Sequence, residues 1–186
     1  MYFEKIKELA EKNMTEKGYK LWRGIDSILP KIWDRPTSST GKYHKNGYGE
    51  VPNIDEHVYQ MFYATVKILR MFNIEMKTPE SDSLIFSVIL HDALKYGKLG
   101  TRKHTDYTHD KLGADMISEN KETFCKIMSE KDFFKMEEAV RFHSGQWSTN
   151  AKHTNNFTFK DYNPETLFVH MLDMLSTADC LKTDID

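Results

Sequence analysis

The sequence predicts an all-α protein, a compact single-domain helical bundle. Apolar residues recur at spacings of three and four positions along most of the chain, a pattern typical of amphipathic helices. No two alternating apolar segments flank a tight turn, so no β-hairpin is indicated. The 186 residues suffice for one domain with a sizeable core, and no internal repeat marks a boundary.

The first half of the chain is expected to contain three helices. The first covers residues 2–16 and stops at Gly18, and a shorter one spans 20–29. Residues 34–53 are rich in Pro, Gly, Ser and Asn, which is typical of a loop. A helix at about 54–72 follows, with one broad apolar face.

The second half begins with the most apolar helix of the chain. Pro79 provides its start signal, and the helix is expected to end near Gly97. Polar loops are expected at 98–108 and 145–162. The remaining helices are expected at about 109–119, 121–129, 132–144 and 163–181.

Composition excludes several classes of protein. No run of about 18 apolar residues is present, so a transmembrane helix is not expected, and the charged N-terminus does not resemble a signal peptide. The net charge of −2 argues against a long nucleic-acid partner. Cys125 and Cys180 lack metal-ligand spacing and are interpreted as free thiols, which predicts a cytoplasmic location.

The dipeptide His91-Asp92 follows the apolar run 84–90 and is the most informative feature of the chain. Burying an imidazole and a carboxylate without compensation would cost several kcal/mol, and a metal ion is the usual compensation. His57 and Asp173 each lie on another helix with an apolar face. These four residues are therefore predicted to form a metal site, although each alone could be a hydrogen-bonded core residue.

Two further histidines are candidates for a second ion. His109 lies where a predicted helix begins, and His143 lies where another ends. Histidines at helix ends can point across a cleft, but they can also be capping or surface residues. Mixed His and Asp ligands suit Mn, Fe, Co, Ni or Zn, and Mg is possible at a second site.

The order of His57, His91-Asp92 and Asp173 resembles that of the HD superfamily of metal-dependent phosphohydrolases, over about residues 50–182. The resemblance is to small single-domain members with extra histidines. It implies an HD-type core at 50–182, with the N-terminal helix 2–16 packed on it. It also implies that the motif residues hold the first metal and that His109 and His143 hold the second.

The same resemblance implies roles in catalysis and substrate binding. The segment from His91 to Lys95 matches the His-Asp-x-x-Lys form, in which the lysine reaches the scissile phosphate. Asp92 and Lys95 are therefore the expected catalytic residues. A basic stretch after the motif suits a phosphorylated substrate, and loop aromatics can stack on a base, although a solvated loop and ordinary packing are the alternatives. The expected substrate-binding residues are Lys42, Tyr43, Lys95, Arg102, Lys103 and Trp147.

The expected function is metal-dependent hydrolysis of a phosphate ester or anhydride of a nucleotide, such as a dNTP, an NMP or a related small phosphate. One alternative is a 3′-5′ exonuclease or phosphodiesterase acting on short single strands or cyclic nucleotides. Another is a non-catalytic HD module that senses a ligand. The apolar N-terminal helix can also serve a second copy of the chain, so a homo-oligomer is possible, and no membrane partner is expected.

Overall fold

The computed structural model describes residues 2–38, 50–148 and 159–177, and in these ranges it contains helices but no strand, which confirms the all-α prediction. An isolated bridge joins Pro36 and Asn53. The α-helices are α1 (Tyr2–Asn13), α2 (Glu16–Ile28), α3 (Ile54–Met71), α4 (Pro79–Leu90), α5 (His109–Glu119), α6 (Lys121–Phe124), α7 (Glu130–Phe142) and α9 (Pro164–Thr177). Two 3₁₀ turns, Gly145–Trp147 and Phe159–Asp161, precede α9.

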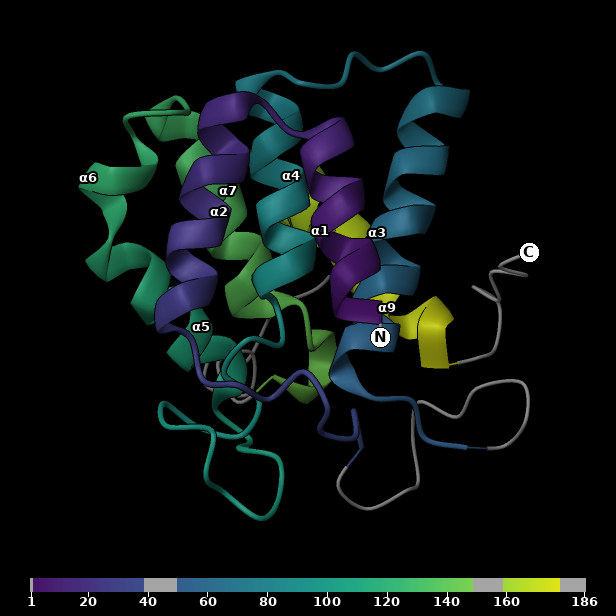
Figure 1. Cartoon of the computed structure of the whole chain (residues 1–186), viewed down its shortest axis with the longest axis vertical. Helices are drawn as coiled ribbons and strands as arrows, with labels where there is room; N and C mark the ends of the chain where they lie inside the picture. The colour runs from purple at the N-terminus through teal and green to yellow at the C-terminus, as the bar shows by residue number, and fades with distance from the viewer. Residues whose placement is uncertain (1, 39–49, 149–158, 178–186) are drawn as a thin grey trace.

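Helix α4 lies at the centre of the bundle and contacts α2, α3, α7 and α9, while α1 packs against α3 (Figure 1). The first turn of α3 and the last turn of α4 lie at the same end of the molecule, in the lower part of Figure 1. The core is built from large apolar side chains that are fully buried, among them Trp22, Phe62, Phe86, Ile89, Phe124 and Phe133. The bundle thereby places His57 of α3 beside the end of α4.

The central helix begins as predicted and ends earlier than predicted. Thr78, the residue before Pro79, forms a capping box with Ser81 in the first turn of the helix. After Leu90 the chain changes to tighter turns, in which Ala93 N–H donates to Leu90 (3.1 Å) and Lys95 N–H donates to Asp92 (3.0 Å). The expected continuation to Gly97 was wrong, because these three-residue turns replace the α-helical hydrogen bonds.

The break between the first two helices lies at Thr15, so the expected stop at Gly18 was also wrong. Thr15 caps α2 by accepting a hydrogen bond from Gly18 N–H at 2.9 Å. The buried Asp82 accepts hydrogen bonds from both the N–H and the hydroxyl of Thr15, at 2.9 and 2.5 Å. A Cβ at position 18 would lie 2.2 Å from Asp82 Oδ2, so the glycine permits close packing inside a helix.

The other helices agree with the prediction to within a few residues, except that α6 has a single turn. Helix α9 starts at Pro164 as expected, and its expected continuation to residue 181 lies outside the described residues. Cys125 is a free thiol, whereas Cys180 is not among the described residues. None of the described helices is long and apolar enough to cross a membrane.

Candidate metal centre

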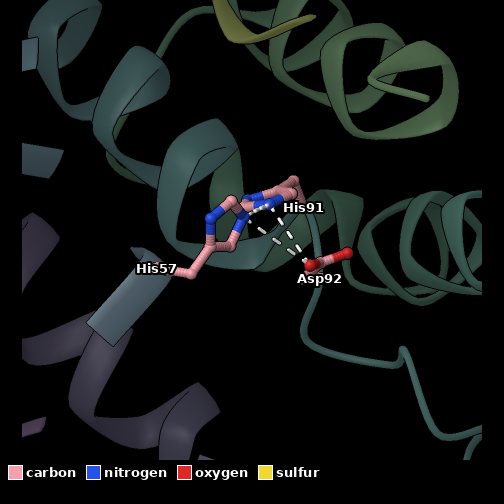
Figure 2. Close-up of side chains that lie close together, drawn as sticks. All are labelled: His57, His91 and Asp92. Atoms are coloured by element: carbon pink, nitrogen blue, oxygen red, sulfur yellow. Dashed lines mark hydrogen bonds and ion pairs between the residues drawn. The ribbon is translucent and has the colours of Figure 1, made fainter. Parts of the chain in front are cut away.

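Three side chains meet where α3 and α4 come together. His57 projects from the first turn of α3, and His91 and Asp92 follow the last residue of α4 (Figure 2). The Nε2 atoms of the two histidines are 3.1 Å apart. Asp92 Oδ2 lies 3.8 Å from His57 Nε2 and 3.5 Å from His91 Nε2. All three side chains are buried, so the predicted core of the first site is assembled.

Asp173 reaches the same group from α9. Its Oδ1 atom lies 3.3 Å from His57 Nε2, and its side chain is 14% exposed. The structure therefore brings together all four residues that the sequence predicted for the first metal.

The two further histidines form a second group on the other side of Asp92. His109 is the first residue of α5, and His143 follows the last residue of α7. Their Nε2 atoms are 3.2 Å apart. Asp92 Oδ1 lies 3.1 Å from His109 Nε2 and 3.6 Å from His143 Nε2. Each oxygen of the Asp92 carboxylate thus faces one of the two histidine pairs.

Hydrogen bonds at the outer nitrogen fix the orientation of all four imidazoles. The Nδ1 atom of His91 lies 2.7 Å from the Val88 carbonyl, that of His109 lies 2.8 Å from the Asp106 carbonyl, and that of His143 lies 2.7 Å from the Val140 carbonyl. Ser176 Oγ donates to the Asp173 carbonyl at 2.6 Å and lies 3.1 Å from His57 Nδ1, so it accepts from that ring. With Nδ1 protonated, a neutral ring presents the lone pair of Nε2 to the centre.

Burial and charge set the protonation of the centre. Burial lowers the pKa of His91 to about 3, which keeps this ring neutral at physiological pH. Burial would raise the pKa of the Asp92 carboxyl, but the Lys95 ammonium and then His91 hold it well below its usual range. Burial would lower the pKa of His143, but Asp92 outweighs burial and raises it. A proton and a metal ion therefore compete for His143 Nε2.

The chemistry of these donors fits a metal ion at each histidine pair. Ligand atoms about 2.0–2.2 Å from one ion lie roughly 3 to 3.5 Å apart in tetrahedral or octahedral geometry. The contacts between the two histidines of each pair, at 3.1 and 3.2 Å, match this spacing. Two neutral nitrogens that face each other with lone pairs repel unless a proton or a metal ion lies between them. Asp92 Oδ1 is buried and makes no hydrogen bond of good geometry to any described residue, which also indicates a cation ligand.

Lys95 lies beside the first group. It is 6% exposed, and its Nζ is 2.5 Å from Asp92 Oδ2. The turn that ends α4 brings this ammonium to the oxygen that faces His57 and His91. A buried lysine is thus held next to the candidate site, and its catalytic role stays a prediction.

The other expected substrate-binding residues occupy different positions. Arg102 forms an ion pair with Asp106 at 2.9 Å, and the Asp106 carbonyl holds His109, so Arg102 supports a ligand of the second group. Lys103 is exposed, and Trp147 is 55% exposed in the turn after His143. Their contact with a substrate stays a prediction. Lys42 and Tyr43 lie outside the described residues.

Residues that support the ligands were not predicted from the sequence. Ser176 and His170 lie three positions after and before Asp173, so the three share one face of α9. This spacing is a sequence signal that could have indicated them. The carbonyl groups that accept from the other imidazoles have no such signal, because every residue carries one.

Comparison with protein-family models, curated proteins and solved structures gives no match for this chain.

Proposed function

We propose that the protein is a metal-dependent phosphohydrolase of the HD type, which hydrolyses a phosphate ester or anhydride of a nucleotide or a related small phosphate. The observation that carries the proposal is the position of Asp92 between two histidine pairs, with one carboxylate oxygen toward each. Paired metal ions are a recurring device of phosphatases and nucleases. The order of the ligands along the chain supports the same reading.

The ligands divide between two ions. His57, His91, Asp92 and Asp173 would hold the first, and Asp92, His109 and His143 would hold the second. Nitrogen and oxygen donors suit Mn, Fe, Co, Ni or Zn, and Mg is an option at the second position. When bound, the ions supply an acidified water and neutralise negative charge on a phosphate.

The protein's own residues would prepare the site for that chemistry. The hydrogen bonds at Nδ1 hold the imidazoles in place, so little reorganisation is needed when a substrate arrives. Lys95 holds its ammonium beside Asp92, where it would pair with a phosphoryl oxygen bound at the first histidine pair. Burial of Asp92 and His91 keeps bulk water from screening these charges. Exposed Lys103 and Trp147 would bind the rest of a small nucleotide, in a cytoplasmic setting.

The proposal is tested by metal analysis and a substrate panel. Purified protein should contain a transition metal and release phosphate from mono-, di- or triphosphate nucleotides in Mn²⁺, Co²⁺ or Zn²⁺. Asp92→Ala should lose both ions and the activity, because each oxygen serves one histidine pair. Asp115→Ala, which removes a carboxylate that pairs with Lys111 and Arg141 instead, is the matched control.

Each other outcome has a definite meaning. Full metal occupancy in Asp92→Ala would reject the assigned centre. Cleavage restricted to short single strands or cyclic nucleotides would replace the proposal by a phosphodiesterase. Nucleotide binding without turnover in metal-loaded protein would replace it by a ligand-sensing module.

A further inference from the structure

The carbonyl group of His143 is held by a side chain from another helix. His143 follows the last residue of α7, where main-chain carbonyls run out of helical partners. The Trp147 N–H, which would continue the α-helical pattern to this carbonyl, donates to Ser144 instead, at 3.1 Å. The buried His170 of α9 takes its place, with Nδ1 donating to the His143 carbonyl at 2.7 Å.

The turn after His143 is shaped around the ring of His170. Gly145 has φ +57°, a conformation that favours glycine. A Cβ at this position would lie 2.2 Å from His170 Cε1 and 2.7 Å from its Nε2. The absence of a side chain at Gly145 thus lets the imidazole approach the backbone closely enough to reach the carbonyl.

Two hydrogen bonds consequently determine where His143 presents its Nε2 atom. The bond from its own Nδ1 to Val140 orients the ring, and the bond from His170 fixes its backbone. Together they keep Nε2 3.2 Å from His109 Nε2 and 3.6 Å from Asp92 Oδ1.

We propose that His170 is a positioning residue that holds His143 in its ligating position and thereby sets the affinity of the second histidine pair for its ion. This inference rests on the proposed metal function. Among the described residues, His170 belongs to neither group of converging ligand atoms, and its Nε2 lies against Gly145. It acts on the second pair from α9, the helix whose Asp173 contacts His57 of the first pair.

The experiment measures binding of each ion separately. Chelator-treated protein is titrated with Co²⁺ in a calorimeter, and thermal unfolding of the same samples is recorded. His170→Phe keeps a ring of similar size against Gly145 and removes the N–H donor. It should weaken the second ion by about 10- to 100-fold, the effect typical of lost outer-sphere hydrogen bonds, and leave the first within about twofold. His170→Asn, whose amide N–H can replace Nδ1–H, should recover most of the second-ion affinity.

Two control variants separate positioning from general damage. Ser176→Ala removes the corresponding acceptor of His57 and should weaken the first ion instead of the second. The ring centroid of Tyr162 lies 5.9 Å from that of His170, and Tyr162→Phe keeps this ring, so both affinities should stay unchanged.

Three results would overturn the inference. The first is a second-ion affinity in His170→Phe that equals that of the wild type. The second is equal weakening of both ions together with a lower unfolding temperature and no recovery in His170→Asn, which would make His170 a merely structural residue. The third is wild-type protein that binds no ion, which would refute both the proposed function and this inference. The first two results would refute the inference alone.

Discussion

Glu165, in the first turn of α9, is a partly buried carboxyl group whose titration should affect stability. Its Oε1 accepts hydrogen bonds from Ser87 at 2.5 Å and from Ser83 at 3.1 Å, both on α4. Burial raises the pKa of Glu165 from 4.5 to about 7, against the hydrogen bonds from the two serines and the nearby charge of Lys135. The group thus couples the central helix to the helix that carries Asp173.

The direction and size of the effect follow from this pKa. Between pH 4.5 and about 7 the folded protein retains a proton that the unfolded chain has already lost. The contribution of this group to the free energy of unfolding is therefore fully present below pH 4.5 and is lost as the pH rises to about 7. At 1.36 kcal/mol per pH unit, the loss amounts to roughly 3 kcal/mol. The side chain in Glu165→Gln is neutral at every pH, so this variant should not show the loss of stability.

Chemical denaturation of metal-free protein between about pH 5 and about pH 8 measures this difference. The free energy of unfolding of Glu165→Gln should rise relative to that of the wild type as the pH increases. Near the highest pH the variant should be more stable by up to roughly 3 kcal/mol. Glu80→Gln, an exposed carboxylate 3.5 Å from the same Lys135, should keep the wild-type pH dependence. Identical pH slopes for Glu165→Gln and the wild type would contradict the raised pKa of Glu165.

Two further predictions concern the metal centre. Lys95→Ala should lower kcat by roughly 100-fold with metal content unchanged, since it removes one charge stabiliser beside Asp92, and a wild-type kcat in steady-state assays would exclude this role. Because Asp92 raises the pKa of His143, protons should displace the second ion as pH falls, whereas His91, with a pKa of about 3, stays available to the first. Calorimetry with Co²⁺ at about pH 5.5 and about pH 7.5 should show the second affinity falling more than the first, and equal losses would contradict the assignment.

The sequence was sufficient for the order of the helices, because helical periodicity determines which faces are buried. The convergence of His57, His91, Asp92 and Asp173 was expected from their apolar helix faces together with the resemblance to the HD superfamily. Two features were mispredicted. Gly18 lies inside a helix at a position where a side chain would collide with Asp82, a tertiary contact that local propensity does not report. Helix α4 ends at Leu90, where three-residue turns replace the α-helical hydrogen bonds.

The support of the imidazoles was beyond sequence reasoning for a different reason. Three of the four Nδ1 atoms donate to backbone carbonyls. Every residue has such a carbonyl, so the sequence does not indicate which ones act as acceptors. His170 also acts on a carbonyl, so only its spacing from Asp173 could have drawn attention to it.

The distribution of the ligands along the chain has a consequence for biosynthesis. A ribosome makes His57 and the His91-Asp92 pair long before His143, and Asp173 emerges last of the six. Because chains begin to fold from the N-terminus during synthesis, the nascent protein passes through a stage in which histidines are present without Asp173 and without His170 behind His143. The complete set of candidate ligands exists only once α9 has been translated and docked, so loading with the proposed ions would be a late event in maturation.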